Sequence, residues 1–305
     1  MENFLSNYQH LPYHINPIAI QIGSFQIHWY SLMYLIAFLI VYLLLIYRIK
    51  KKEGGYKPGF VLDFLLYAIA GLLIGARLGY VLFYNLPFFI SHPLAIFYPF
   101  DMSENYVGIS GMSFFGGMIG IVLAGIIFVY LRGLASLNQN LPAYPAGGQR
   151  KPSLSNNFFR LADFVVPAIP AGYFFGRIGN FLNGELYGRI TQKPWGMYFP
   201  LDLSGLLRHP SQLYEAFFEG LVIFVILWTI RNKSKFTGQL LLTYLFLYGL
   251  FRFFIEFFRE PDPQIGLVFS FFTLGQIFSS LLMVVAIAIY FLKKNTFRTV
   301  DKCGV

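Results

Sequence analysis

Runs of mostly apolar residues alternate with polar segments along the whole chain. Each run is about 20 residues long, which is typical of an α-helix that spans the hydrocarbon core of a bilayer. The pattern therefore predicts an all-α integral membrane protein with short extracytoplasmic segments, forming a single polytopic domain over residues 1–305. Seven transmembrane helices are expected, over residues 27–47, 60–84, 113–131, 161–182, 211–230, 237–258 and 268–292.

Composition agrees with a membrane protein and excludes an ordinary soluble domain. Hydrophobic residues make up 56% of the 305 residues and charged residues only 12%, whereas a soluble domain carries about 25% charged residues. The single cysteine, Cys303, lies in the C-terminal tail, so it can form no internal disulfide and is a poor candidate nucleophile.

The loops differ in charge, and the difference predicts the orientation of the chain. Sixteen lysines and arginines lie after the first, third and fifth spans and in the C-terminal tail, against four in the opposite loops. Because cytoplasmic loops carry the excess, we expect the N-terminus outside and the C-terminus in the cytoplasm. The net charge of +9 is thus a topology signal that also suits anionic membrane lipids, and it argues against nucleic acid as a partner.

Segments between the spans carry little further information. Residues 1–26 are polar and aromatic and predict a short surface segment without a removable signal peptide, because no basic region and cleavage site precede the first span. Residues 133–157 are rich in glycine, proline, asparagine and serine and predict a flexible cytoplasmic loop.

Three arginines lie inside predicted spans: Arg77, Arg177 and Arg252. Each stands five to seven residues before the outer end of its helix, which places it roughly 8–10 Å below that end at 1.5 Å per residue. An ionisable residue at membrane depth is costly and usually faces a partner or a wet cavity. Three arginines at one depth therefore predict one polar site in the outer half of the membrane.

The stretch 176–189 is the richest in polar residues, with two arginines, a glutamate, two asparagines and four glycines. A helix end capped by glycines is the plainer interpretation of this stretch alone. Arg177 and Asn180 share a helix face, as do Tyr248, Arg252 and Glu256. Arg252 with Glu256 could equally be a structural helix pair. Snorkelling to the surface is the expectation for Arg189 and Arg259 from their positions alone.

Neither a metal site nor a nucleotide site is indicated. The five histidines have no paired ligand spacing, and a cluster of cysteines is lacking. The run from Gly116 to Gly120 follows no strand, so it predicts close helix packing rather than a dinucleotide fingerprint. We therefore expect no metal and no cofactor.

At this point the chain resembles the bacterial prolipoprotein diacylglyceryl transferases over about residues 14–292. The stretch 176–189 is similar to the signature of that family. Further similar blocks occur in the same order along the chain, at residues 28–34, 75–85, 208–215, 248–252 and 256–262.

The resemblance implies an enzyme of the bacterial inner membrane. It would move the diacylglyceryl group of phosphatidylglycerol to the lipobox cysteine thiol in the signal peptide of a prolipoprotein, releasing glycerol phosphate without a cofactor. By similarity Arg177 and Arg252 would hold the lipid head group, and Arg77 joins them by its depth. The same site would include Tyr30, Asn180, Glu185, Gly188, Tyr248 and Arg259.

One departure concerns the catalytic base. Many members carry a histidine where Phe115 stands here, so that base cannot operate in this chain. The alternative function is a membrane protein that binds or transports anionic lipids. It predicts charged groups through both leaflets and internal repeats, and the sequence has neither.

Overall fold

The computed structural model describes residues 2–23, 25–83, 86–96, 111–138, 154–260, 267–268 and 272–302. Side chains are described for these residues except 2–3, 25, 114–115, 133–138, 267–268 and 295–302. Tyr84 at the predicted end of the second span, Cys303 and most of the predicted loop 133–157 therefore lie outside the described residues. The chain forms two compact units, residues 1–47 with 159–305 and residues 48–158.

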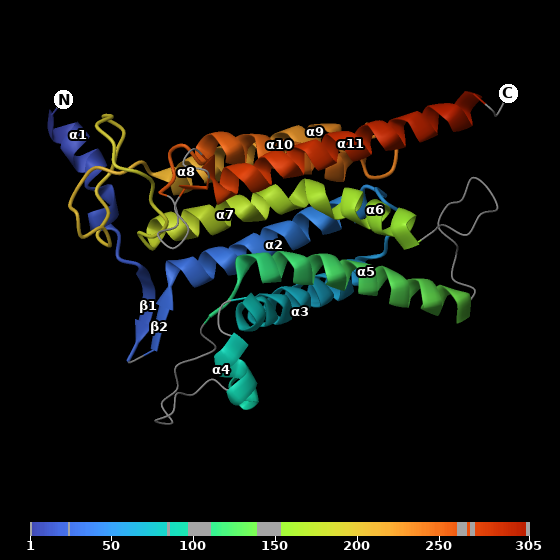
Figure 1. Ribbon diagram of the computed structural model, residues 1–305, viewed down its shortest axis with the longest axis horizontal. Helices are drawn as coiled ribbons and strands as arrows, with labels where there is room; N and C mark the ends of the chain where they lie inside the picture. Colours follow the sequence, from blue (N-terminus) through green and yellow to red (C-terminus); the bar gives the residue numbers. More distant parts are fainter. Residues whose placement is uncertain are drawn as a thin grey trace. The chain divides into compact units, whose positions relative to one another are not determined.

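The first unit holds most of the helices (Figure 1). A short helix and a hairpin precede the first long helix, and α10 and α11 run side by side. Its elements are α1 (Glu2–Gln9), η1 (Leu11–His14), β1 (Ile18–Ile22), β2 (Phe25–His28), α2 (Trp29–Lys50), α6 (Leu154–Val165), η3 (Val166–Ala168), α7 (Ile169–Leu182), α8 (Ser211–Glu215), the π-helical η4 (Ala216–Val222), α9 (Ile223–Ile230), α10 (Gln239–Ile255), β3 (Leu267–Val268), β4 (Phe272–Thr273) and α11 (Leu274–Lys302).

The second unit is built on two helices, α3 (Pro58–Phe83) and α5 (Phe114–Asn138), which pack along each other (Figure 1). Two short elements follow α3, namely α4 (Leu86–Ser91) and η2 (Pro93–Ile96). α5 continues beyond the predicted end at Leu131, because helical backbone extends into the polar residues that follow the apolar run.

Most of each predicted span falls on a helix, but the seventh was predicted to start too early, because Leu267–Val268 and Phe272–Thr273 are short strands and α11 begins at Leu274. Five helices are long and apolar enough to cross a membrane, at Trp29–Lys50, Pro58–Phe83, Leu154–Leu182, Ser211–Ile230 and Leu274–Lys294. The other two predicted spans fall on shorter apolar helices, Gly116–Arg132 and Gln239–Ile255. The fourth span is interrupted by the 3-10 turn η3, because Pro167 and Pro170 lack the N–H groups that a continuous α-helix requires.

Glycines bring α3 and α5 into close contact, which confirms the packing role predicted for the run from Gly116 to Gly120. A Cβ built on Gly116 would lie 2.3 Å from the Gly75 carbonyl oxygen, and one on Gly120 would lie 2.0 Å from that of Gly71. Small residues at four-residue spacing let helix backbones approach in this way where lipid supplies no hydrophobic driving force.

We expect Gly120→Ala to destabilise the second unit, because its new methyl group would overlap the Gly71 carbonyl. Overpacking of this kind costs about 1–3 kcal/mol, which thermal unfolding in detergent would report as a lower melting temperature. Gly59→Ala is the matched control on α3, since nothing lies within 4 Å of its Cβ position. Equal melting temperatures for the two variants would contradict the close approach of the helices.

The N-terminal segment packs on a segment that is distant in sequence. The backbone N–H of Tyr198 donates to the carbonyl of Gln9 (2.8 Å), and the Tyr8 hydroxyl donates to that of Trp195 (3.3 Å). The rings of His10 and Tyr198 stack at 4.6 Å. Tyr8 also packs on a buried cluster of Phe181, Met197 and Phe199. Residues 2–16 and 183–210 therefore form one small folded cap next to α7, called the cap below.

Candidate active site

Glu215, at the end of α8, is the centre of a buried ion-pair cluster. Its side chain is only 3% exposed, and three arginines reach it from two other parts of the chain. Its two oxygens lie 2.7 Å from Arg177 Nε, 3.0 Å from Arg252 Nη1 and 3.7 Å from Arg259 Nη1. A buried carboxylate with this many cationic partners holds the guanidinium groups in place.

On the α7 side, Arg177 begins a short chain of polar contacts. Its Nη1 donates to Asn180 Oδ1 (3.2 Å), and the Asn180 amide donates to Glu185 Oε1 (2.8 Å). The backbone of Glu185 is fixed in turn, since the buried amide of Gln212 donates to its carbonyl (2.6 Å). The predicted shared face of Arg177 and Asn180 is confirmed.

On the α10 side, Arg252 contacts several carboxylates. Its Nη2 lies 3.3 Å from Glu256 Oε2 one helical turn further on, which confirms the predicted helix pair. Its Nη1 lies 3.0 Å from Glu215 and 3.9 Å from Glu219. The Glu256 carboxylate packs against Gly275 at the start of α11, where a Cβ would lie 2.7 Å from it. Arg252 therefore links three helical segments.

A second layer of the cluster lies one helical turn from the first. The Tyr173 hydroxyl donates to Glu219 Oε2, and the Tyr173 ring faces the Arg177 guanidinium, with Cζ 4.8 Å from the ring centroid. Glu219 lies in the π-helical stretch η4, a rare helix form that often occurs at functional sites. Sequence reasoning missed Tyr173 and Glu219 and included Glu215 only in the similar block 208–215, not among the site residues. The available signal was a second acidic residue, four positions after Glu215, inside an apolar run.

Gly188 joins the cap to the end of α10. Its N–H donates to the His209 carbonyl (2.8 Å), and the neighbouring Arg189 N–H donates to the Phe258 carbonyl (2.9 Å). A Cβ on Gly188 would lie 2.2 Å from that Phe258 oxygen, so only glycine fits. Snorkelling was the wrong expectation for Arg259, because pairing with Glu215 leaves its side chain only 18% exposed. Arg189 is also held, through its Nε, by the Arg259 carbonyl (2.9 Å).

Three predicted site residues remain, and they lie on three different helices. Tyr30 starts α2, and its hydroxyl donates to that of Tyr34 (3.1 Å). Tyr248 lies one turn before Arg252, with its ring 6.2 Å from that of Tyr173. Arg77 belongs to the second unit, where its guanidinium donates to the carbonyls of Ala95 (2.8 Å), Ile96 (2.8 Å) and Gly111 (3.2 Å). The structure thus brings together two of the three arginines of equal predicted depth.

A buried ion pair holds the cap itself. Arg208 donates to both oxygens of Asp202, with its Nε at 2.6 Å from Oδ2 and its Nη2 at 3.1 Å from Oδ1. Arg208 also reaches Glu260 beyond the end of α10 (3.1 Å). The hydrogen bonds from Arg208 lower the pKa of Asp202 from 3.8 to about 2. Such two-point contacts fix orientation as well as charge.

We expect the stability of the cap to fall in acid because of Asp202. The pKa of Asp202 is lower in the folded than in the unfolded chain. Its contribution to the stability of the fold is therefore complete above pH 3.8 and is lost as the pH falls to about 2. Thermal unfolding followed over this range should show a smaller pH dependence for Asp202→Asn. Asp63→Asn is the control, because the Asp63 side chain in its ion pair with Arg132 is 45% exposed. An unchanged pH dependence in Asp202→Asn would contradict this assignment.

His209 is the histidine that lies nearest in sequence to the cluster. Its Nδ1 lies 3.1 Å from the Tyr214 hydroxyl, and burial, with the charge of Lys193, lowers its pKa below the ordinary value. It is therefore neutral at physiological pH. His28 is exposed. Phe115, which replaces the usual histidine of the family, lies in the first turn of α5, and its side chain falls outside the described residues.

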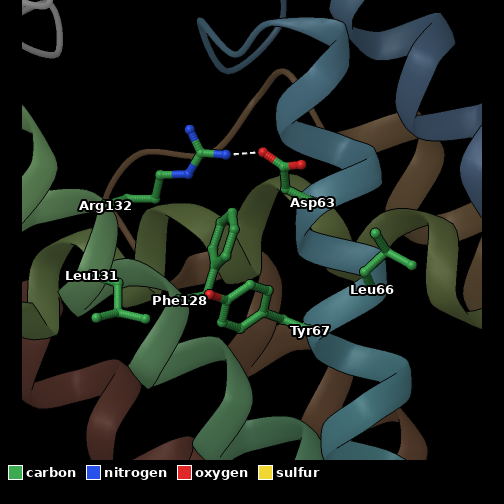
Figure 2. Close-up of a pocket in the computed structure, with 6 residues that line it drawn as sticks. All are labelled: Asp63, Leu66, Tyr67, Phe128, Leu131 and Arg132. Atoms are coloured by element: carbon green, nitrogen blue, oxygen red, sulfur yellow. Dashed lines mark hydrogen bonds and ion pairs between the residues drawn. The ribbon is translucent and has the colours of Figure 1, made fainter.

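A separate pocket of about 410 Å³ lies in the second unit between α3 and α5, lined by Asp63, Leu66, Tyr67, Phe128, Leu131 and Arg132. Figure 2 shows Asp63 and Arg132 pointing toward one another over the rings of Phe128 and Tyr67. The Arg132 Cζ also lies 5.5 Å from the centroid of Phe128. Because its charges pair with each other, this pocket is a weaker candidate than the Glu215 cluster.

Fold and site together define the class of the protein. Long apolar helices carry a buried cluster of arginines and glutamates, which is too costly in a membrane to persist without a function. Among the described residues, groups of three or more histidine, cysteine, aspartate or glutamate side chains suited to a metal ion are absent. The chain is a multi-pass membrane protein with a charged site.

Comparison with known proteins gives the family. The family model described as prolipoprotein diacylglyceryl transferase matches residues 17–292. Relatives called phosphatidylglycerol–prolipoprotein diacylglyceryl transferase include one from Chlorobaculum tepidum, 43% identical over 99% of this chain and 98% of its own. One from Bordetella avium is 43% identical (86% and 88%), and one from Francisella tularensis is 41% identical (94% and 98%). The chain belongs to the prolipoprotein diacylglyceryl transferase family and is a transferase, which confirms the resemblance.

Proposed function

We propose that this chain transfers the diacylglyceryl group of phosphatidylglycerol to the lipobox cysteine thiol of prolipoproteins. The observation that carries the proposal is the convergence of Arg177, Arg252 and Arg259 on Glu215 in a member of this family. A phosphate group is the anion that best fits such a cluster, since arginine donates to phosphate oxygens in pairs.

In this reaction the thiol sulfur attacks the carbon of the diacylglycerol unit that is bonded to the phosphate oxygen. A carbon–sulfur bond forms, the carbon–oxygen bond breaks, and glycerol phosphate leaves with the bonding electrons while the thiol loses its proton. Charge therefore develops on the leaving phosphate, where fixed donors are most effective. A guanidinium has five N–H groups, so Arg177 and Arg252 can hold Glu215 and a phosphate at once.

The other predicted residues support these two arginines. Asn180 and Glu185 continue the contacts of Arg177, and Gly188 allows the backbone approach that brings Arg259 to Glu215. Tyr30 and Tyr248 would complete the walls of the site. Arg77 remains a proposed lipid contact, although its donors to three carbonyls also give it a role in holding the loop after α4.

The attacking thiol needs no dedicated base of the usual kind in this proposal. A free thiol has a pKa of about 8.5, so a few per cent is thiolate at neutral pH. Nearby arginines raise that fraction. His209, six residues before Glu215 and with a pKa below its ordinary value, is an alternative acceptor for the proton.

We also propose seven transmembrane helices in the bacterial inner membrane, with the N-terminus outside and the cluster in the outer half. The charge difference between the loops supports this orientation. The acceptor is itself a membrane-inserted signal peptide, so it would enter sideways between helices, together with the lipid.

Purified protein in phosphatidylglycerol micelles with a lipobox peptide tests the proposal directly. We expect the peptide to gain the mass of a diacylglyceryl group, with release of glycerol phosphate. A peptide with serine in place of the cysteine, and micelles of phosphatidylethanolamine, are the controls. A protein that binds the lipid without modifying the peptide would instead be a lipid-binding protein, and the proposal would be wrong.

A further inference from the structure

A second layer of buried and half-buried polar groups lies behind the arginines, and two of its members, Tyr173 and Glu219, have no part in the proposed reaction. Tyr173 and Tyr248 each precede an arginine of the cluster by four residues, on α7 and α10. Glu219 follows Glu215 by four residues on a segment that the predicted topology runs in the opposite direction. The three side chains therefore occupy one level, a turn deeper than the arginines.

Tyr173 and Glu219 connect the two arginines through this layer. The Tyr173 hydroxyl donates to Glu219 Oε2, while the ring of the same tyrosine faces the guanidinium of Arg177 at 4.8 Å. The other oxygen of Glu219, Oε1, lies 3.9 Å from Arg252 Nη1 and accepts no hydrogen bond from the described residues. Glu219 is only 1% exposed. One Tyr–Glu pair thus contacts both arginines from behind.

Glu215 cannot by itself determine how the guanidinium groups are turned. Its two oxygens are shared among three arginines, so further contacts are needed, and Asn180 and Glu256 supply two of them, to Arg177 and Arg252. A flat ring against the flat guanidinium of Arg177 fixes its plane. The Glu219 carboxyl group lies on the inner side of Arg252, 3.9 Å from its Nη1, and limits the rotation of that guanidinium.

The backbone around Glu219 allows its carboxyl group to reach the Tyr173 hydroxyl. The π-helical stretch η4 carries Glu219, and Gly220 next to it packs against Phe174, the neighbour of Tyr173. A Cβ on Gly220 would lie 2.8 Å from Phe174 Cα, so the two helices approach as closely as glycine allows. This approach brings the Glu219 carboxylate to the Tyr173 hydroxyl.

We propose that Tyr173 and Glu219 are positioning residues for diacylglyceryl transfer, which hold the guanidinium groups of Arg177 and Arg252 in the orientation that receives the leaving phosphate. The inference rests on the proposed function and adds two residues to it. Neither residue touches the substrate. Their effect is on the rate of transfer, because a misplaced donor stabilises the transition state less than the bound lipid.

Four variants test the proposal: Tyr173→Phe, Glu219→Gln, the double variant, and Tyr244→Phe. Tyr173→Phe keeps the ring and removes the hydroxyl, and Glu219→Gln keeps the shape and replaces the carboxyl group with an amide. Tyr244→Phe is the matched control, since it removes another half-buried tyrosine hydroxyl, one turn before Tyr248, and no hydrogen bond joins that hydroxyl to either arginine in the described structure. For each variant, kcat and KM for phosphatidylglycerol are measured together with the melting temperature.

We expect each single variant to lower kcat by about 10- to 100-fold, the range that a small misplacement produces, with little change in KM. The double variant should lose less than the product of the two single losses, because both changes act on one pair of interacting side chains. Tyr244→Phe should match the wild type. If Glu219→Gln fails to accumulate, Tyr173→Phe alone carries the test.

Wild-type kcat in Tyr173→Phe or in Glu219→Gln would overturn the inference while leaving the proposed function intact. Losses that simply multiply in the double variant would overturn it as well, and so would losses that follow only the melting temperature. An inactive wild type in the same assay would instead reject the proposed function.

Discussion

Arg177→Ala and Arg252→Ala should each abolish most turnover while the protein still inserts into the membrane. Both guanidinium groups lie on Glu215, at 2.7 and 3.0 Å, where they can receive the charge of the leaving phosphate. Removing one such donor commonly lowers kcat by about 10²–10³-fold. Arg→Lys at either position should fall between alanine and wild type, because lysine keeps the charge but lacks the planar fork.

The measurement is the rate of lipobox-peptide modification at saturating phosphatidylglycerol, with expression and melting temperature recorded for every variant. Arg231→Ala is the matched control, since this arginine stacks on Trp228, with Cζ 4.3 Å from the ring centroid, after the end of α9. An alanine variant at 177 or 252 that kept most of the wild-type rate would show a structural arginine and a misassigned site.

Glu215→Ala should have the largest effect on folding of any single change in the cluster. This one carboxylate forms ion pairs with Arg177, Arg252 and Arg259, whose side chains are only 13%, 14% and 18% exposed. Removing one partner of a buried ion pair typically costs about 3–5 kcal/mol, because the remaining charge is left without compensation. We expect low accumulation in the membrane and aggregation in detergent. Glu215→Gln should be milder, since its amide oxygen still accepts hydrogen bonds.

Membrane abundance and size-exclusion chromatography in detergent measure this effect, and Glu260→Ala is the control. The Glu260 side chain is 47% exposed, and its partner Arg208 keeps the two contacts to Asp202. Normal abundance and an unchanged melting temperature for Glu215→Ala would mean that water, rather than this carboxylate, stabilises the charges of the three arginines.

The helices could be predicted from the sequence because their signal is local. A long apolar run has one stable form in a bilayer, so the predicted spans fall on helices, with ends displaced by only a few residues at Pro58, Phe83 and Lys50. Helices extend further than predicted at Asn138 (end of α5), Leu154 (start of α6) and Lys302 (end of α11), because polar residues can continue a helix outside the apolar run. α11 begins later than predicted, at Leu274, after the short strands β3 and β4. The break at η3 follows from prolines that hydropathy alone does not weigh.

The site could be predicted only in part. The polar stretch and the family resemblance pointed to Arg177, Asn180, Glu185 and Arg252, which the structure joins through Glu215. What remained hidden was the identity of each partner. A glutamate four residues beyond Glu215 looks like one more polar residue until the fold brings α7 against η4.

The location of Arg259 could not be predicted from the sequence either. Its position just after a span made a surface location the natural expectation, since long side chains reach water easily there. The close contact of Gly188 with Phe258 decides otherwise, because it seats the cap on the end of α10 and leaves Arg259 beside Glu215. Contacts between distant segments set this outcome, and one-dimensional patterns do not contain them.

The cap also imposes an order of assembly on the growing chain. Tyr8 and its partner Trp195 are 187 residues apart in sequence, so the first segment to be synthesised waits for one of the later ones. At roughly 5–20 residues per second, ribosomes need on the order of ten seconds or more to supply it. Until then the aromatic residues of the N-terminal segment lack their partners in residues 183–210. In the proposed topology, translocation of the segment after α7 would be the event that completes the cap, and pausing before residue 195 should leave the N-terminal segment accessible to protease.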